Sequence, residues 1–330
     1  MLLIKTKLGK FIQIAIYISI VVASNAGLAQ SRVVIIPMAG DDLKPLKNII
    51  TVAKENGDFT SPGDALDAIG TTLPAATENN PYLVVIAPGR YSLLEPLVMQ
   101  EYVDIAGSGQ NVTTLSGYIG TNSLDASSAI VVGENHASLR DLTIQNLGGS
   151  GAFSIGIYNH SASPLLSNIT VNMYGNDKQY GVVNSTNSRP VISYLTMLLN
   201  NGTQKIGMTS NASFPIISNT KITVSNGSQQ QAGISSYALS PATSRPIISN
   251  TIIEVSGGSS NIGLRNSSAT ASMIVRNSTV DATTSIAAGT GIDENQTYIS
   301  DSFLKGSVTG SPQCSFVFKT DGTALNPSCQ

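Results

Sequence analysis

The chain repeats itself with a period of about 26 residues, and this repetition limits its fold more than any other feature. From about residue 139 onward, a strand-like segment centred on a Ser-Asn step alternates with a glycine that precedes an apolar residue. The first marker steps by 27, 26, 25, 31, 27 and 24 residues, and the second by 25, 26, 26, 30 and 28. Because both markers drift together, one structural unit is repeated with insertions in its loops. The two columns are Asp141, Asn168, Tyr194, Asn219, Asn250, Asn277 and Asp301, and Gly156, Gly181, Gly207, Gly233, Gly263 and Gly291.

Apolar residues alternate with polar ones inside each unit, as in Ile222-x-Val224 and Ile253-x-Val255. A period of two indicates strands, whereas helical repeats need a period of 3.6. Such a unit buries its apolar side chains only against its neighbours, so we predict an all-β solenoid, a parallel β-helix. The recurring prolines fit strand starts, where a missing amide donor is tolerated. The asparagines of the first column are expected to hydrogen-bond along the stack.

The composition agrees with a solenoid. Of 330 residues, 12% are charged and 41% are hydrophobic, and there is no tryptophan. That hydrophobic content excludes a disordered chain. After residue 30 no apolar run approaches the roughly 18–20 residues of a spanning helix, so we expect no transmembrane segment in the mature chain.

Residues 1–29 have the pattern of a secretory signal peptide. Lys5, Lys7 and Lys10 form a basic start, residues 11–23 are largely apolar, and small residues precede an expected cleavage site near Ala29. We therefore expect a secreted or periplasmic protein. Removing three lysines from 18 basic residues leaves 15 against 20 acidic residues, a net charge of −5, which disfavours binding to nucleic acid.

The only two cysteines, Cys314 and Cys329, lie in the last 17 residues. In an exported protein a disulfide is the natural interpretation. It would close a loop of about 15 residues and stabilise the fold by roughly 3 kcal/mol. No histidine follows His160, so a metal site at the cysteines is not expected.

The two ends of the solenoid are expected to differ from its coils. Residues 61–73 predict a helix, with Ser61 as N-cap, Pro62 at the first position and one apolar face, and we assign residues 30–82 to an N-terminal strand and this capping helix. The coils then cover residues 83–310, with early strands at Leu83–Ala87, Leu97–Ile105 and Ala129–Val132. Residues 311–330 form a tail with the disulfide.

The segment ITVAKENGDFTSPGDALDAI, followed by NPYLVVIAPGRYSL, resembles the opening of pectinesterases and of the wider pectin-lyase-like superfamily. The resemblance covers about residues 49–92 and implies a single-domain right-handed parallel β-helix. More narrowly, the whole chain resembles secreted bacterial β-helix repeat proteins. The catalytic strings of pectinesterases, polygalacturonases and pectate lyases are absent, so the resemblance assigns no catalytic residue here.

Stacking the repeats brings out one pair of carboxylates. Thr223, Glu254, Asp281 and Lys305 each follow the asparagine column by four residues, so they are expected on consecutive rungs about 4.8 Å apart. Glu254 and Asp281 would then be adjacent like charges that need an offset. The main interpretation is an ordinary surface on which Lys305 supplies that offset. Calcium binding and glycoside-hydrolase-type catalysis are the alternatives.

Aromatic residues offer a second candidate site. Tyr158, Tyr174 and Tyr180 could form a platform on which sugars stack, although isolated surface tyrosines would explain the same sequence. The outward positions two residues after the glycine column include Tyr158 and end in Arg265 and Asp293, which we expect to form an ion pair. His136 and His160 precede strands in turn-like sequence and are assigned to turns.

These features favour an exported protein that binds a polysaccharide or another cell-surface polymer without a recognisable catalytic site or cofactor. The first alternative is a diverged carbohydrate-active enzyme of the esterase, lyase or glycoside hydrolase type. The second is an adhesive or spike-like structural protein that oligomerises side by side. The sequence leaves the polymer and the oligomeric state open.

Overall fold

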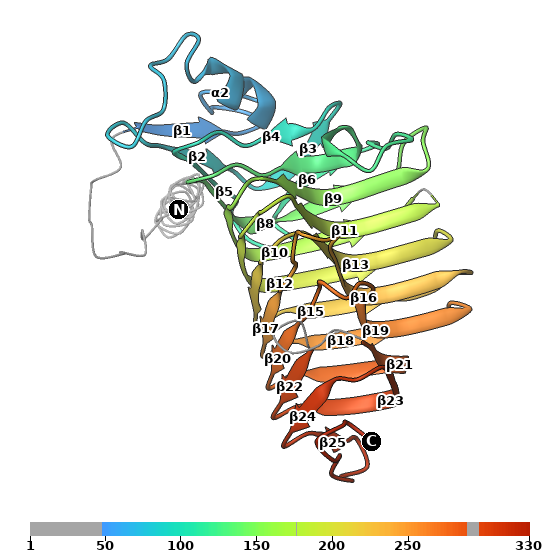
Figure 1. Cartoon of the computed structure of the whole chain (residues 1–330). Helices are drawn as coiled ribbons and strands as arrows, with labels where there is room; N and C mark the ends of the chain where they lie inside the picture. Colours follow the sequence, from blue (N-terminus) through green and yellow to red (C-terminus); the bar gives the residue numbers. More distant parts are fainter. Residues whose placement is uncertain (1–47, 176, 289–296) are drawn as a thin grey trace, which may run out of the picture. The chain divides into compact units, whose positions relative to one another are not determined.

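A computed structural model describes residues 48–175, 177–288 and 297–330 of the chain. The expected signal peptide, Gly291 and Asp293 lie outside these residues. Parallel strands stack in about eight turns of a β-solenoid (Figure 1). Helix is confined to α2, Pro62–Ala68, and the short 3₁₀ helix η1, Ala126–Ser128, among the residues described. The predicted all-β class is confirmed.

Each full coil contributes strands to three faces, which we number in chain order. The first face is built by β1 Asn48–Val52, β2 Tyr82–Ile86, β5 Val103–Ala106, the first parts of β8 Ser138–Asn146, β10 Leu165–Met173 and β12 Val191–Leu199, then β14 Ile216–Ser218, β17 Ile247–Ser249, β20 Ile274–Arg276, β22 Tyr298–Ser300 and β24 Gln313–Ser315. All of these strands pair in parallel, each with the equivalent strand of the next coil.

The second and third faces follow the same rule. The second consists of β3 Gly89–Leu93, β6 Thr113–Gly117, the later parts of β8, β10 and β12, β15 Lys221–Val224, β18 Ile252–Val255, the first parts of β21 Thr279–Ala287 and β23 Phe303–Thr309, and β25 Phe318–Lys319. The third consists of β4 Leu97–Val98, β7 Ala129–Val132, β9 Phe153–His160, β11 Lys178–Ser185, β13 Gln204–Asn211, β16 Gln230–Tyr237, β19 Ser260–Asn266 and the later parts of β21 and β23.

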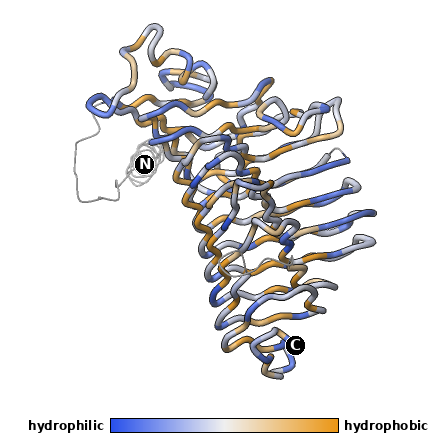
Figure 2. Tube along the Cα trace, viewed as in Figure 1, coloured by the Kyte–Doolittle hydropathy of each residue, from blue (hydrophilic) through white to orange (hydrophobic). Residues whose placement is uncertain are grey.

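The core lies inside the solenoid, where the alternating apolar side chains of all three faces meet. Strand β18 shows the pattern: Ile253 and Val255 are buried, whereas Ile252 is exposed. Figure 2 shows hydrophobic positions recurring from coil to coil along the stack. Each coil therefore completes its core against the coils above and below it, as the period-two pattern predicts.

The asparagine column forms the corner between the first and second faces. All seven of its residues have positive φ, between 44° at Asn277 and 60° at Asp141. Asn and Asp tolerate this left-handed conformation better than other non-glycine residues. The predicted ladder is present where amides are adjacent: the Nδ2 groups of Asn277 and Asn250 donate to the Oδ1 atoms of Asn250 and Asn219, at 2.7 and 3.3 Å. Tyr194 interrupts it.

The glycine column is explained by close approach between coils rather than by its φ angles. A Cβ atom added to Gly181 would lie 2.5 Å from the carbonyl oxygen of Gly207, and one added to Gly207 would lie 2.6 Å from that of Gly233. Real Cβ atoms do not approach other atoms so closely, so glycine is required at these positions within β11 and β13.

The N-terminal end differs from the prediction in two details. Helix α2 begins at Pro62 as expected but ends at Ala68, five residues before the predicted end, and the Ser61 side chain makes no capping hydrogen bond. Leu66 and its helical neighbours still bury their apolar side chains in the solenoid core, so the helix covers its end. The predicted strand Leu97–Ile105 is wrong: a turn with Tyr102 at φ 62° separates β4 from β5.

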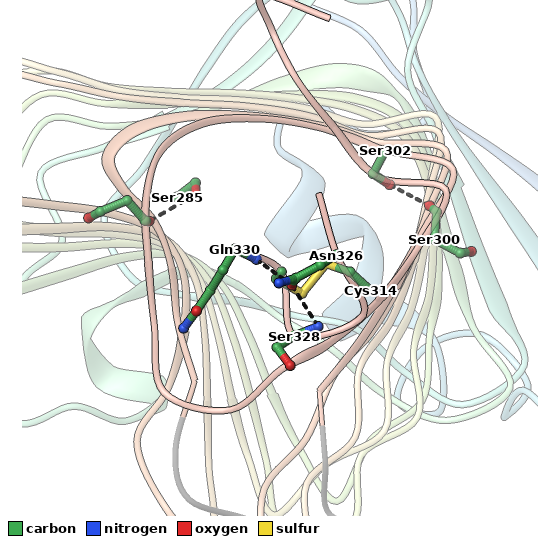
Figure 3. The surroundings of a disulfide bond; sticks show 9 residues. Ser285, Ser300, Ser302, Cys314, Asn326, Ser328 and Gln330 are labelled. Carbon is green, nitrogen blue, oxygen red and sulfur yellow. Dashed lines mark hydrogen bonds between the residues drawn. A yellow bond between two sulfur atoms is a disulfide. The ribbon is translucent and has the colours of Figure 1, made fainter. Parts of the chain in front are cut away.

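The C-terminal tail closes the other end. Cys314 and Cys329 form the predicted disulfide, and both are buried (Figure 3). Asn326 holds the last turn, because its Oδ1 atom accepts hydrogen bonds from the backbone amides of Ser328 and Gln330, each at 3.0 Å. The tail also supplies β24 and β25, so the cross-link ties the chain end to the final rung.

Candidate functional site

The third face presents two straight columns of outward side chains along β9, β11, β13, β16 and β19. The first column has the register expected from the sequence, which is therefore confirmed for these five rungs. The second column was not singled out from the sequence. The members are Tyr158, Val183, Thr209, Ser235 and Arg265 in the first column, and His160, Ser185, Asn211 and Tyr237 in the second.

These columns line a groove of about 480 Å³. Its lining includes Tyr158, His160, Tyr180, Ser185, Tyr237 and Arg265, and Leu124 from the loop before η1 forms part of the wall. Larger or similar hollows occur beside α2, with about 810 Å³, at the asparagine corner, with about 470 Å³, and on the first face, with about 400 Å³. None of the three combines aromatic rings with a partly buried charge, so the third-face groove is the better candidate site.

The floor of the groove is apolar although it lies outside the solenoid core. Tyr180, Val183, Ile206 and Ala232 belong to a separate buried cluster on the outer side of the third face. The rings of Phe153 and Tyr180 are stacked with centroids 6.3 Å apart. An outer sheet surface with buried aliphatic and aromatic groups is suited to a ligand that has apolar patches.

Arg265 is the charged group of the groove. Its Nε donates to Ser235 Oγ at 3.1 Å, and its Nη1 donates to Gln230 Oε1 at 2.5 Å. Burial lowers the pKa of its guanidinium, and the Tyr180 phenol opposes that shift. Burial likewise raises the pKa of Tyr180. Both hydrogen-bond partners of Arg265 are neutral, and within the described ranges no carboxylate forms an ion pair with it.

His160 lies at the end of β9 rather than in a turn, which corrects the sequence assignment. Its Nδ1 atom is 3.0 Å from Ser185 Oγ, one rung away. The imidazole also stacks on Tyr158, with ring centroids 6.1 Å apart and planes 5° apart. The pair forms a flat aromatic and polar surface at one end of the groove.

The structure brings together two of the three predicted tyrosines. Tyr158 and Tyr180 line the groove, but Tyr174 follows the end of β10 and is not part of its lining. Sequence reasoning missed Tyr237 and paired Arg265 with Asp293, which lies outside the described residues. The signal that could have found Tyr237 is its offset of four residues from Gly233, the same offset that relates His160 to Gly156.

Glu254 and Asp281 occupy consecutive rungs of the second face, in the register expected from the sequence. Lys305 Nζ lies 2.9 Å from Asp281 Oδ2, and Lys221 Nζ lies 3.1 Å from Glu254 Oε2. Thr223 also donates to Glu254. Each carboxylate thus has its own lysine on an adjacent rung, and neither lines the groove. Their catalytic or calcium-binding role stays a prediction.

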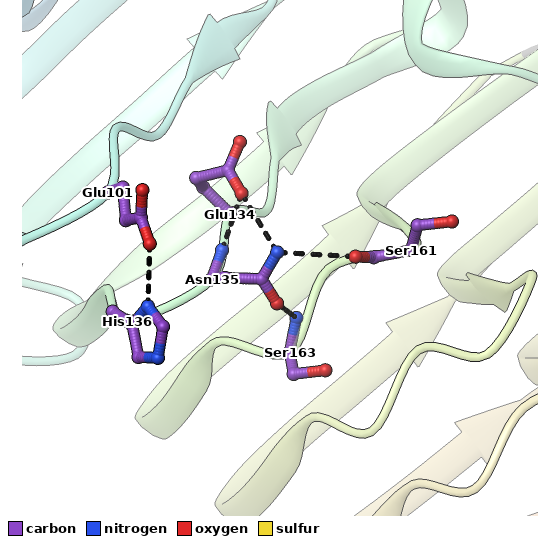
Figure 4. A network of polar contacts seen from close by, with 6 residues as sticks. All are labelled: Glu101, Glu134, Asn135, His136, Ser161 and Ser163. Atoms are coloured by element: carbon purple, nitrogen blue, oxygen red, sulfur yellow. Dashed lines mark hydrogen bonds and ion pairs between the residues drawn. The ribbon is translucent and has the colours of Figure 1, made fainter.

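The corner between the third and first faces carries another polar cluster (Figure 4). His136, with φ 51°, occupies a turn as expected, and its Nδ1 is 2.7 Å from Glu101 Oε1. Asn135 bridges two coils: its Nδ2 donates to the Ser161 carbonyl at 3.3 Å, and its Oδ1 accepts from the Ser163 amide at 3.0 Å. These contacts hold successive corners together.

Two other features are absent from the described part of the chain. No three His, Cys, Asp or Glu side chains cluster there in a way that could hold a metal ion. No helix in those same ranges is both long and apolar enough to cross a membrane.

Comparison with solved structures identifies the fold. Pectate lyase Pel9A aligns with a TM-score of 0.55 and 13% identity, covering 85% of this chain and 82% of that one. The polygalacturonase from Erwinia carotovora ssp. carotovora aligns with a TM-score of 0.52 and 12% identity, covering 88% of this chain and 87% of that one. The ybhc protein of Escherichia coli aligns with a TM-score of 0.50 and 13% identity, covering 91% of this chain and 82% of that one.

The chain therefore has the right-handed parallel β-helix fold of these proteins, as the opening segment predicted. No protein-family model matches the sequence, and no curated protein matches it. At 12–13% identity the similarity defines the fold alone.

Proposed function

We propose that the third-face groove binds an acidic polysaccharide, with Arg265 receiving a sugar carboxylate and the tyrosines stacking on the sugar rings. The observation that carries this proposal is the Arg265 guanidinium, which is partly buried and whose hydrogen-bond partners among the described residues are the neutral groups of Ser235 and Gln230. An arginine keeps its charge in proteins. A carboxylate of a ligand could pair with this guanidinium, and such charge-assisted hydrogen bonds are strong.

The aromatic residues support a carbohydrate rather than a small anion. Tyr158 is only partly buried on the rung next to Val183, and Tyr180 forms the floor with Ile206. Flat aromatic groups beside hydrogen-bonding side chains fit a ring that is apolar on its face and polar at its rim. The five rungs of the groove extend about 19 Å, at about 4.8 Å per rung, which suits an extended chain better than a compact molecule.

Fold similarity adds a weaker argument. Two of the structural neighbours are named as a pectate lyase and a polygalacturonase, which act on pectic polysaccharides. The shared fold makes a related polymer a reasonable first ligand to test, but fold alone does not establish function.

The test is calorimetric titration of the chain with an oligogalacturonate and with a neutral oligosaccharide of equal length. We expect the anionic ligand to bind, and Arg265→Gln to weaken its binding at least about tenfold. Arg189→Gln is the matched control, because Arg189 lies over the Phe214 ring and outside the groove. Equal affinity of Arg265→Gln and the unmodified chain would overturn the proposal, as would preference for the neutral ligand.

A diverged carbohydrate-active enzyme is the alternative, with Glu254 and Asp281 as its candidate residues. It has less support because the two carboxylates lie on the second face and each is engaged by a lysine. The enzyme would be favoured if the chain released reducing ends or unsaturated products from pectin or alginate, and if the double variant Glu254→Gln, Asp281→Asn abolished that release.

We also infer export of the chain. The pattern of residues 1–29 and the disulfide between Cys314 and Cys329 both suit an oxidising compartment. N-terminal sequencing of the protein recovered from cell fractions tests this, and an intact Met1 on the mature protein would contradict cleavage near Ala29.

A further inference from the structure

The outer surface of the first face carries a continuous column of aliphatic side chains. Its members follow one another in register on five consecutive rungs, and the first four are between 38% and 47% exposed. Single exposed aliphatic residues are ordinary, but an uninterrupted row of them marks an interaction surface. The column consists of Leu165, Val191, Ile216, Ile247 and Ile274.

A second column of small side chains runs beside it, two residues further along each strand. Four of its five members are serines, and Arg276 replaces serine on the fifth rung. Because alternate residues of a strand point to the same side, both columns stand on the outer surface about 7 Å apart. The first face thus has an aliphatic ridge and a parallel groove, both with the rung spacing as their repeat. The serines are Ser167, Ser193, Ser218 and Ser249.

We propose that two copies of the chain pair side by side through their first faces. A two-fold axis parallel to the solenoid axis, placed between the two columns, sets the aliphatic ridge of each copy into the serine groove of the other. Such an interface is isologous, since the same patch serves both partners. The rung spacing is identical in the two copies, so each rung repeats the same contact.

The charges at the edges of this face fit such a pairing. Arg189 and Arg245 lie on the edge before the strands, whereas the asparagine corner, including Asn250, forms the other edge. The proposed two-fold axis exchanges the edges, so each arginine edge meets the partner's asparagine edge and not its arginines. The edge arginines of the two copies are therefore kept apart, and the aliphatic centre is surrounded by a largely polar rim, as in known interfaces.

The size of the face agrees with a specific dimer. From β8 to β24 it comprises the eight strands β8, β10, β12, β14, β17, β20, β22 and β24. At about 4.8 Å per strand and about 18 Å for the six residues across it, the face offers about 700 Å² per partner. Specific interfaces bury about 1,200–2,000 Å² in total, so this edge-to-edge area, about 1,400 Å² for both partners together, falls at the lower end of that range.

Sedimentation velocity of the full chain over a wide concentration range tests the pairing. We expect a reversible dimer, and we expect Ile216→Lys combined with Ile247→Lys to raise its dissociation constant at least about tenfold, because lysines would replace the centre of the ridge. Ile252→Lys is the matched control: Ile252 is similarly exposed but belongs to the second face. A chain that stays monomeric, or a control that dissociates the dimer equally, would overturn the proposal.

Cysteine cross-linking tests the two-fold arrangement itself. Ile216→Cys chains mixed with Ser218→Cys chains should form covalent dimers faster than either variant alone, because the ridge residue of one copy faces the groove residue of the other. The native cysteines are already paired and do not interfere. Equal rates in all three samples would exclude the proposed packing. Circular dichroism of every variant confirms that its fold is intact.

Discussion

Two cations on strands of the third face have opposite surroundings. Lys205 of β13 points into the solenoid and is fully buried, and its Nζ donates to the Asn201 carbonyl at 3.0 Å. Arg265 of β19 points outward into the groove. Neither has a carboxylate partner among the residues described. Burial of the interior cation costs stability, whereas the outer cation lines an open groove.

The largest expected effect concerns Lys205. Burial lowers the pKa of its amine to about 8, from the ordinary 10.5. Between pH 8 and 10.5 the unfolded chain holds a proton that the folded chain has released, so the free energy of unfolding rises with pH by at most about 3 kcal/mol. Lys205→Met should remove this rise and stabilise the protein by about 1–3 kcal/mol at pH 7, as measured by urea unfolding.

The control for that experiment is Lys205→Arg. Arginine stays charged over the whole range, so this variant should lose the rise in stability above pH 8 without gaining stability at pH 7. If Lys205→Met is less stable than the unmodified chain at pH 7, the interior lysine contributes through its hydrogen bond to Asn201, and the contrast with Arg265 fails.

A smaller effect on stability is expected at Arg265. Because its guanidinium is only partly buried, Arg265→Met should change the free energy of unfolding by no more than about 1 kcal/mol in the absence of ligand. The same variant should bind the oligogalacturonate at least about tenfold more weakly. Thermal unfolding with and without ligand separates the two quantities. A large loss of stability with unchanged binding would make Arg265 a structural residue.

The smallest effect is expected for the paired charges of the second face. Glu254→Gln and Asp281→Asn should each cost less than about 1 kcal/mol, because their ion pairs with Lys221 and Lys305 are exposed to solvent. Ligand binding in the groove should not change. Urea unfolding in low and high salt measures the change in stability. A loss of ligand affinity in either variant would show that the second face, and not the third-face groove, takes part in binding.

Features that depend on the repeat period could be predicted from the sequence. The parallel solenoid, the register of Glu254 with Asp281, and the asparagine ladder all follow once equivalent residues are stacked. The disulfide was predictable because the chain has only two cysteines. The positive φ of the asparagine column was not recognised, although it explains that column as well as the ladder does.

The site was less predictable because it depends on side-chain direction and on loops. Tyr174 is close to Tyr180 in sequence, but the turn after β10 places it outside the groove. His160 reads as a turn residue, yet β9 extends to include it. Arg265 was correctly placed on the outer column, but its contacts are with Ser235 and Gln230, which lie 30 and 35 residues earlier on the neighbouring strand β16.

The asparagine ladder has a consequence for the environments in which the protein stays folded. Amide groups do not titrate and are not screened by dissolved ions, unlike the ion pairs with which many proteins join neighbouring elements. Cohesion between the coils at the corner of Asn219, Asn250 and Asn277 should therefore be nearly independent of ionic strength and acidity. A solenoid assembled in this way suits surroundings whose salt content the cell does not control.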